Sequence, residues 1–224
     1  IGKYAFNECK KLKNIEIPNE FHLPIDPRII VDSFIIDKCK VMNSKKKPFS
    51  LLFKNASPFD TDPPGMLFKV GDDLRQDQLT LQVMKVMEHL WRTNYKDMHM
   101  RCYGVLPTGF NQGFIEAVPN SVTEAELQAK KGTIAGVLEK KLFSDYFSAN
   151  NPKVTYDRVL ENFRLSSAGY AVATCVLGVA DRHPGNIMVQ KDGHYFHIDF
   201  GHFLGNFKVK MGYKRENAPF HFSP

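Results

Sequence analysis

Three polar residues in the last quarter of the chain have types and spacing that suit magnesium-dependent chemistry on phosphates. Asp181 is followed five positions later by Asn186, and Asp199 begins an Asp-Phe-Gly triplet. Two carboxylates and an amide oxygen form the kind of oxygen ligand set that holds magnesium on a nucleotide. The residue types and their spacing therefore predict a phosphoryl-transfer site.

The residues between Asn186 and Asp199 predict a β-hairpin that brings these two side chains to one end. Apolar runs flank Lys191-Asp192-Gly193, and an Asp-Gly step between such runs signals a tight turn because Gly accepts a positive φ. We therefore expect Asp181 and Asn186 to meet Asp199. Protein kinases use the same Asp-to-Asn spacing before Asp-Phe-Gly, although their His precedes the Asp. Either motif alone would be weak, and the combination favours phosphoryl transfer over a structural turn.

Lysines upstream of this stretch are candidate phosphate ligands. Ser44 and Lys46 lie in a polar segment between two apolar runs, where a solvated turn is the simpler interpretation and a phosphate-binding loop is the functional one. Lys69 lies inside the apolar run Met66–Val70, and a buried Lys needs an anionic partner. Asp77 is close enough in sequence to share a pocket with Lys69. The chain contains neither of the two common glycine-rich phosphate-binding motifs.

Apolar periodicity predicts the elements that position these residues. We expect strands within 28–42, 49–53, 66–70, 98–106 and 110–118. Two helices should begin at Gly71 and after Ser121, and two more should cover 132–150 and 155–180. Ser121 and Glu124 match a capping box at the start of one helix. The helix that begins at Gly71 should bury an apolar stripe: Val83, Met84, Val86, Met87, Leu90 and Trp91.

The order of these elements predicts an α+β fold with two lobes. Residues 1–27 form an entrance or linker, residues 28–118 a β-rich N-lobe, and residues 119–224 a mostly helical C-lobe. Glu116 to Pro119 would be the hinge between the lobes, where backbone groups could hold an adenine ring. The chain begins at Ile1 without a visible signal peptide and ends soon after the site, so we expect a fragment of a longer polypeptide.

Composition limits the class of protein further. Apolar residues make up 43% and charged residues 24% of 224 residues, which is typical of a globular protein. Four cysteines without a C-x-x-C pair argue against a zinc site or a disulfide framework and for a reducing compartment. The net charge of +6 is consistent with a solvated surface or with an anionic partner.

The motifs around Asp181, Asp199 and Gly71–Asp77 together resemble the catalytic domain of phosphoinositide 3-kinases, with class I enzymes closest, over about residues 29–224. The resemblance implies a two-lobed kinase fold that uses ATP and Mg²⁺. It assigns Ser44 and Lys46 to the phosphate loop, Lys69 to the ATP phosphates, Asp77 and Tyr103 to the inner pocket, Glu116 and Val118 to the adenine hinge, Asn186 and Asp199 to magnesium, Asp181, His183 and His202 to catalysis, and Lys208, Lys210, Lys214 and Arg215 to the lipid headgroup.

The resemblance also bears on the general base. It implies that His202 takes the hydroxyl proton while Asp181 orients the reactants, and a His titrates near neutral pH as a general base should. By analogy with protein kinases the base would be Asp181. Ala180 replaces a common Gly, and Phe207 and Val209 interrupt a loop that class I enzymes fill more densely with lysine.

The basic loop after Asp199 predicts a phosphorylated lipid as substrate. We expect 3-phosphorylation of phosphatidylinositol 4,5-bisphosphate, with phosphatidylinositol also accepted, by a cytoplasmic protein that is recruited peripherally to membranes. A regulatory or adaptor subunit would bind through regions outside this chain. The alternatives are a class II or III lipid kinase, a related serine/threonine protein kinase, and a non-enzymatic scaffold or nucleic-acid-binding module. The intact set of Lys69, Asp181, Asn186 and Asp199 argues against a non-enzymatic module and nucleic acid as a partner.

Overall fold

The computed structural model describes residues 19–42, 44, 46–59, 62–132 and 141–202, and the backbone of 209–210 and 213–214. The chain divides into two compact units. The first unit consists of Ile1–Gln78 and Tyr103–Pro119, and the second consists of Leu79–Cys102 and Asn120–Pro224. Residues 79–102, which we expected in the N-lobe, therefore group with the second unit, and the lobe boundaries themselves stay predictions.

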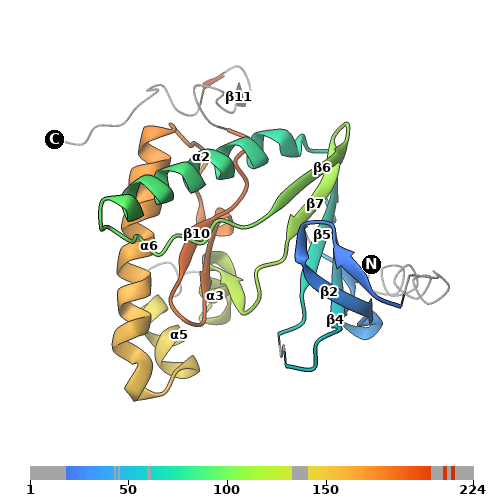
Figure 1. The fold of residues 1–224 in the computed structure, drawn as a ribbon. Helices are drawn as coiled ribbons and strands as arrows, with labels where there is room; N and C mark the ends of the chain where they lie inside the picture. The colour runs from blue at the N-terminus through green and yellow to red at the C-terminus, as the bar shows by residue number, and fades with distance from the viewer. Residues whose placement is uncertain are drawn as a thin grey trace. The chain divides into compact units, whose positions relative to one another are not determined.

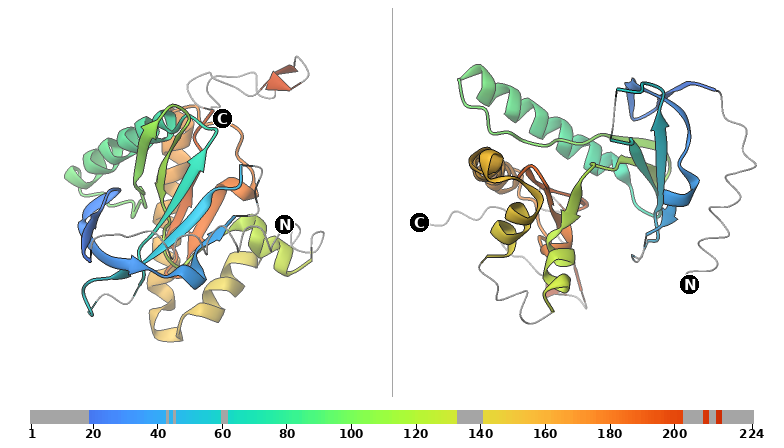
Figure 2. Two further views of the ribbon diagram at one scale, coloured as in Figure 1. Left: turned by 90° about the vertical axis from the view of Figure 1, so that its right-hand side faces the viewer. Right: turned by 90° about the horizontal axis from the view of Figure 1, so that it is seen from below.

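The first unit is built on an antiparallel sheet with the strand order β1-β2-β4-β5-β7-β6, in which β3 pairs with β4. These strands lie side by side in every view (Figures 1 and 2). A short 3-10 helix, η2 (Ile36–Lys38), separates β2 from β3. The strands are β1 (Phe21–Leu23), β2 (Asp26–Phe34), β3 (Lys40–Val41), β4 (Phe49–Asn55), β5 (Gly65–Val70), β6 (Val105–Gly109) and β7 (Gln112–Glu116).

The core of the first unit explains why the apolar runs form strands. Leu23, Val31, Phe53 and Met66 are at most 3% exposed and pack in one cluster. Alternate residues of a strand face one side of the sheet, so each run contributes a few side chains to this cluster. Strands within 28–42, 49–53, 66–70 and 110–118 are thus confirmed.

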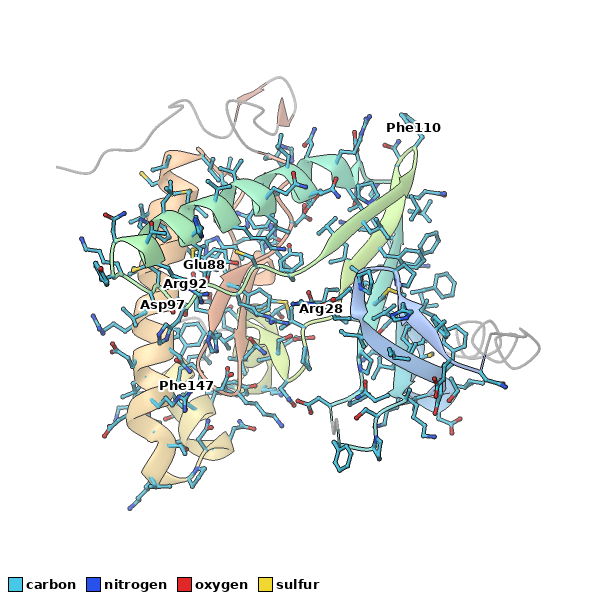
Figure 3. The ribbon with its side chains drawn as sticks, in the orientation of Figure 1. Arg28, Glu88, Arg92, Asp97, Phe110 and Phe147 are labelled. Carbon is cyan, nitrogen blue, oxygen red and sulfur yellow. The ribbon has the colours of Figure 1, made fainter. Side chains whose placement is uncertain are left out.

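The strand expected over 98–106 begins only at Val105, so that prediction was wrong for its first seven residues. His99 has a φ of 45°, which interrupts an extended run before Tyr103. The hairpin of β6 and β7 turns at Phe110 and Asn111, and Asn111 takes a φ of 54° there. Phe110 points away from the hairpin tip and is 88% exposed (Figure 3).

The second unit combines helices with a small antiparallel sheet of order β10-β9-β8. Its core cluster contains Phe147 (Figure 3) together with Leu127, Leu142, Val159 and Val189. Helix α2 (Leu74–Thr93) begins in the first unit and continues into the second. The remaining elements are β8 (Ser121–Thr123), α3 (Glu124–Lys130), α5 (Leu142–Asn150), η3 (Lys153–Thr155), α6 (Tyr156–Val176), η4 (Pro184–Asn186), β9 (Ile187–Gln190), β10 (Tyr195–His197), β11 (Val209–Lys210) and β12 (Tyr213–Lys214).

Helix α2 corrects one prediction about burial. Its buried face is formed by Asp77, Thr80, Leu81 and Met84, which follow the i, i+3, i+4, i+7 spacing. Val86 and Leu90 lie on the opposite face and are 58% and 55% exposed. Because this helix has apolar residues on both faces, periodicity alone did not identify the buried one. Within the described residues, no helix is long and apolar enough to span a bilayer.

The cap of helix α3 lies two residues later than expected. Ser121 lies in β8, paired with Gln190, so it cannot cap a helix there. Thr123 caps α3 instead: its hydroxyl accepts a hydrogen bond from Glu126 N at 3.1 Å, and Thr123 N donates to Glu126 Oε2 at 2.9 Å. The capping box is real but belongs to Thr123 and Glu126 rather than Ser121 and Glu124.

Candidate active site

The predicted hairpin is present as β9 and β10, whose register pairs Ile187 with His197. Its turn depends on Gly193, which has a φ of 97°. A Cβ on Gly193 would lie 2.0 Å from the carbonyl oxygen of Val159, so the turn sits directly on α6. Asn162 of α6 donates a hydrogen bond from Nδ2 to Asp192 O at 2.8 Å, which fixes the same turn.

The open end of the hairpin brings two segments together, the one before β9 that carries Asn186 and the one after β10 that carries Asp199. We call these segments the two candidate metal loops. Ile198 N donates to Asn186 O at 3.0 Å, and Ala180 N donates to His202 O at 2.8 Å. These backbone bonds place the loop that carries Asn186 beside the segment that carries Asp199, as the hairpin predicted.

Asn186 is oriented in a way that suits a metal ligand. Its side chain is largely buried, and its Nδ2 donates to Asp181 O at 3.1 Å. That bond uses the nitrogen side of the amide and leaves Oδ1 to face another partner. An amide oxygen and the Asp199 carboxylate are hard oxygen ligands, so the residues fit magnesium, which commonly takes few protein ligands and completes its shell with phosphate and water. Among the described residues, no group of three or more His, Cys, Asp or Glu side chains forms a metal site.

Arg182 links the two loops through its whole guanidinium group. Nε donates to Ala180 O at 3.0 Å, Nη1 donates to Ile198 O at 2.8 Å, and Nη2 donates to Asp199 O. The guanidinium carbon also lies 5.6 Å from the ring centroid of the fully buried Phe200. Although Arg182 was part of the Asp-Arg-His motif, sequence reasoning gave it no role.

Both candidate aspartates have unusual backbone conformations. Asp181 has a φ of 57° and Asp199 a φ of 60°, which is the left-handed region that non-glycine residues rarely adopt. Such strain costs about 1–3 kcal/mol per residue and persists only where the surroundings fix it. The bonds to Asp181 O from Asn186 and to Asp199 O from Arg182 are part of those surroundings.

The candidate catalytic histidines lie on the two loops. The ring of His183 is exposed, and its Nδ1 accepts a hydrogen bond from Gly185 N at 3.1 Å, which caps η4. His202 is half-buried, and its carbonyl oxygen accepts a hydrogen bond from Ala180 N. Ala180 directly precedes Asp181, so this bond holds His202 beside the loop that carries Asp181. The catalytic roles of Asp181, His183 and His202 remain predictions.

A buried histidine beside the site was not predicted. His197 stacks on Tyr170, with ring centroids 5.3 Å apart, and its Nε2 lies 3.0 Å from the Tyr195 hydroxyl. Burial, and secondarily the charge of Arg182, lowers the pKa of His197 to about 4. His197 is therefore neutral at physiological pH and belongs to the core. Its place in the His-Ile-Asp-Phe-Gly run was the only available signal.

In the first unit, the two candidate phosphate-binding lysines converge on one carboxylate. Lys69 Nζ lies 2.8 Å from Asp72 Oδ2, and Lys46 Nζ lies 3.4 Å from Asp72 Oδ1. Lys46 also donates to Gly71 O at 2.7 Å, while Ser44 is exposed in the same turn. Lys69 thus has the anionic partner that its position in a strand required. That partner, Asp72, was missed although it lies in the quoted Gly71–Asp77 segment.

The other residues assigned to the nucleotide also lie in the first unit. Glu116 fixes the start of β6, because its Oε2 accepts from Gly104 N at 2.7 Å and its own N donates to Gly104 O at 2.9 Å. Tyr103 and Asp77 are 3% and 5% exposed, and Val118 is half-buried. The assignment of Asp77 to the pocket of Lys69 and that of Glu116 and Val118 to adenine remain predictions.

Two of the four predicted headgroup cations lie outside the described residues, namely Lys208 and Arg215. Lys210 and Lys214 belong to β11 and β12, which pair antiparallel with Val209 opposite Lys214. The segment was expected to be loop-like, and this short hairpin corrects that expectation for its paired residues. Each of its two strands has two residues.

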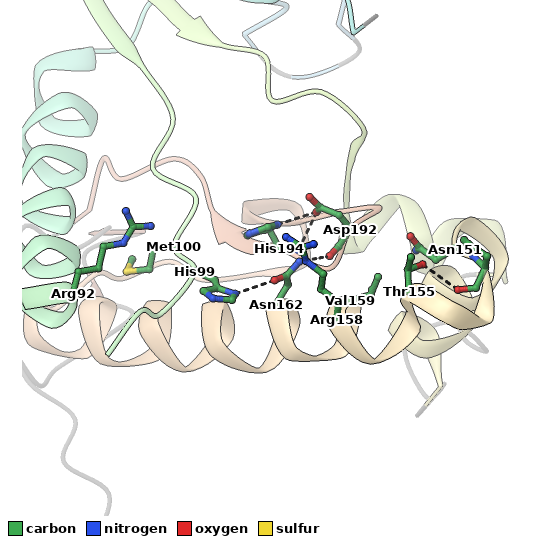
Figure 4. A pocket seen from close by; sticks show the side chains of 11 residues that line it. Arg92, His99, Met100, Asn151, Thr155, Arg158, Val159, Asn162, Asp192 and His194 are labelled. Atoms are coloured by element: carbon green, nitrogen blue, oxygen red, sulfur yellow. Dashed lines mark hydrogen bonds and ion pairs between the residues drawn. The ribbon is translucent and has the colours of Figure 1, made fainter. Parts of the chain in front are cut away.

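A pocket of 610 Å³ lies in the second unit, where the β9–β10 turn and the N-terminal half of α6 meet the segment after α2 (Figure 4). None of the predicted site residues lines it. His194 Nδ1 lies 2.9 Å from Asp192 Oδ1, and His99 Nδ1 lies 2.9 Å from Asn162 Oδ1. Arg92 at its edge is paired with Glu88 at 3.1 Å and with Asp97 at 3.3 Å (Figure 3). The charged side chains that line this pocket are therefore of both signs and largely paired within the protein.

Comparison with known sequences places this geometry in context. A sequence model of the family described as phosphatidylinositol 3- and 4-kinase matches residues 64–224. That range covers the strand that carries Lys69, the hairpin, and both candidate metal loops.

Individual relatives agree with this match. Phosphatidylinositol 3-kinase 2 of Dictyostelium discoideum is 47% identical over 214 residues, which cover 95% of this chain and 12% of the relative. Phosphatidylinositol 3-kinase 3 of the same organism is 48% identical over 99% of this chain and 13% of its own length. The phosphatidylinositol 3-kinase C2 domain-containing subunit gamma of Rattus norvegicus is 45% identical over 90% of this chain and 13% of its own length. The chain therefore spans only a small part of the relatives that it matches.

Proposed function

The chain belongs to the phosphatidylinositol 3- and 4-kinase family, and we propose that it carries the catalytic machinery of a lipid kinase that transfers the γ-phosphate of ATP to the 3-hydroxyl of a phosphoinositide. The observation that carries this proposal is the joining of two loops at one end of the β9–β10 hairpin, where Asn186 and Asp199 offer an amide oxygen and a carboxylate. Relatives named phosphatidylinositol 3-kinase at 45–48% identity support the choice of a lipid as acceptor.

Phosphoryl transfer depends mainly on positioning and on neutralising phosphate charge, which defines what the residues must do. Asn186 and Asp199 would hold Mg²⁺, which when bound neutralises charge on the nucleotide phosphates. Lys69 and Lys46 would contribute two ammonium groups to nucleotide phosphates. Because both lysines now contact Asp72, a triphosphate would compete with that carboxylate for them.

The acceptor hydroxyl must lose its proton during the transfer. We assign this step to His202, whose backbone bond to Ala180 holds it beside the loop of Asp181. A neutral imidazole can take the proton near physiological pH. Asp181 would then orient the hydroxyl, and His183 would lie near the transferred phosphate.

The finer choice of lipid is also proposed, on the basis of charge. Lys208, Lys210, Lys214 and Arg215 follow the metal loop, and each phosphate on the inositol ring can accept charge-assisted hydrogen bonds from such side chains. We therefore propose phosphatidylinositol 4,5-bisphosphate as the preferred substrate, with phosphatidylinositol also accepted. The enzyme would work from the cytoplasm on membranes that it visits peripherally, with a regulatory subunit bound through other parts of the protein.

The experiment is a substrate panel for the full-length protein that contains this chain. Radiolabelled ATP is supplied with vesicles of phosphatidylinositol, its 4-phosphate or its 4,5-bisphosphate, and separately with a generic protein substrate. We expect label in the 3-position of the lipids. Label only in the protein would favour a protein kinase, and no transfer at all would contradict an enzyme.

A variant separates lipid choice from membrane affinity. Lys208→Ala combined with Lys210→Ala should reduce activity on the bisphosphate and spare phosphatidylinositol, because only the bisphosphate offers ring phosphates to the loop. Equal losses on both lipids would instead assign these lysines to general membrane attraction.

A further inference from the structure

The predicted magnesium ligand Asp199 adopts a backbone conformation that it would not keep by itself. Its φ of 60° lies in the left-handed region. This region is unfavourable for every residue except Gly, although Asn and Asp tolerate it better than the others. The carboxylate of Asp199 starts from this Cα, so a change of φ and ψ would move the carboxylate relative to Asn186. Contacts within the protein must therefore stabilise the left-handed conformer.

Arg182 has the geometry to make that selection. The orientation of the Asp199 carbonyl is set by the ψ angle of Asp199, and this carbonyl accepts a hydrogen bond from Nη2 of Arg182. The preceding carbonyl, that of Ile198, accepts from Nη1 at 2.8 Å. Two successive carbonyls are thus fixed by two nitrogens of one rigid planar group.

The guanidinium group is itself held in place. Its Nε donates to Ala180 O at 3.0 Å, and Ala180 N is bonded to His202 O at 2.8 Å. The buried ring of Phe200 lies beneath it, 5.6 Å away, in a cation–π contact. Phe200 follows Asp199 directly, so any rotation of the Asp199–Phe200 peptide would break both the hydrogen bond and the ring contact.

We propose that Arg182 is a positioning residue that locks Asp199 in the conformation required to hold Mg²⁺ together with Asn186. The inference rests on the proposed function of Asp199 as a metal ligand. Arg182 acts through Asp199 and Phe200 and needs no contact with ATP or lipid. The role requires three nitrogens in a fixed fork, so the single ammonium group of a lysine should not replace it.

The lock predicts a specific change in metal dependence. Without it, Asp199 would populate ordinary backbone conformations, and only the competent fraction could bind metal. The left-handed conformation costs about 1–2 kcal/mol, which by the arithmetic of population shifts raises the Mg²⁺ concentration required by roughly 5- to 30-fold. Contacts of the nucleotide that do not involve the metal should keep their strength.

The experiment measures binding without turnover, in the full-length protein. The affinity for a non-hydrolysable ATP analogue is determined calorimetrically at a series of Mg²⁺ concentrations for wild type, Arg182→Lys and Arg182→Gln. We expect both variants to need roughly 5- to 30-fold more Mg²⁺ for the half-maximal effect, with unchanged affinity in the absence of Mg²⁺. Arg164→Gln is the matched control, because Arg164 is an exposed arginine of the same unit that pairs with Glu161 at 2.7 Å.

A wild-type Mg²⁺ dependence in Arg182→Lys would overturn the lock, since charge alone would then suffice. An equal loss of affinity with and without Mg²⁺ would also overturn it, because that pattern indicates general unfolding. Hydrogen exchange in the wild type provides a test that needs no variant. Peptides covering residues 178–186 and 196–202 should be protected before metal and nucleotide are added, and protection that appears only on their addition would contradict the proposal.

The two hypotheses fail in different ways. If nucleotide binding by the wild type shows no Mg²⁺ dependence, the proposed role of Asp199 is wrong. The exchange measurement then decides by itself whether Arg182 orders the two loops.

Discussion

Replacing Gly193 by Ala should disrupt the site from a distance, because this residue lets the hairpin turn rest on α6. The added Cβ would lie 2.0 Å from Val159 O, whereas ordinary contacts begin at 3.4 Å. The turn would have to move outward by more than 1 Å, and the bond from Asn162 Nδ2 to Asp192 O at 2.8 Å would break. Asn162 is only 7% exposed, so water could not easily replace Asp192 O as the acceptor of its amide hydrogen bond.

The cost can be estimated from three contributions. The left-handed φ costs an alanine about 1–2 kcal/mol, and the stiffer unfolded chain returns about 0.4–1 kcal/mol. Loss of a hydrogen bond to a buried amide adds about 1–3 kcal/mol. We therefore expect the free energy of opening of this hairpin to fall by about 3 kcal/mol, and the proposed phosphoryl transfer to be lost because the loops that carry Asn186 and Asp199 would separate.

Gly132→Ala is the matched control. Gly132 has a similar φ of 88°, but no described atom lies within 4 Å of its added Cβ. It should lose only about 1 kcal/mol from backbone strain. Native-state hydrogen exchange of peptides from β9 and β10 in the full-length protein measures the free energy of opening of the hairpin in both variants. If Gly193→Ala opens no more easily than Gly132→Ala, the contact between the turn and α6 does not support the site.

Three further outcomes follow from other residues. The pKa of His197 falls from 6.5 to about 4 on folding, so between these pH values the unfolded chain binds a proton that the folded protein does not bind. The free energy of unfolding should therefore decrease by up to about 3 kcal/mol as the pH falls from 6.5 to 4. His197→Gln should flatten this part of the pH dependence of thermal unfolding. Cys102 is half-buried and desolvation raises its pKa to about 12, while Cys175 is exposed, so iodoacetamide at pH 8 should alkylate Cys175 well before Cys102. Mass spectrometry showing the reverse order would contradict this difference between the two thiols. His202→Ala should slow transfer by about 10²–10⁴-fold with little change in ATP affinity, whereas normal turnover in this variant beside an inactive Asp181→Asn would assign the base to Asp181.

Local sequence signals sufficed for the hairpin, and they did so for a physical reason. The Asp-Gly step at 192–193 and the apolar runs around it specify a turn and two strands with little help from the rest of the chain. The same holds for β5, whose run is apolar except for Lys69. Signals that depend on tertiary pairing were less reliable: Ser121 resembles a helix cap, but its pairing with Gln190 makes it a strand residue.

The parts of the site that sequence analysis missed are contacts between distant segments. Arg182 reaches carbonyl groups 16 and 17 residues away, and no spacing rule indicates which backbone oxygens a guanidinium will meet. Asp72 is three residues from Lys69, yet its second partner, Lys46, comes from a different turn. On α2, apolar residues on both faces hid the exposure of Val86 and Leu90, which only packing decides.

The most direct test of the central claim compares wild type with Asp199→Asn in the transfer of labelled phosphate from ATP to phosphoinositide vesicles. Asn keeps the size of the side chain and removes the charge that Mg²⁺ requires, so the protein should stay folded while 3-phosphorylated lipid disappears. Thermal unfolding of both proteins provides the control for folding. Lipid phosphorylation within about tenfold of wild type by folded Asp199→Asn would contradict the assignment of this hairpin as the phosphoryl-transfer centre.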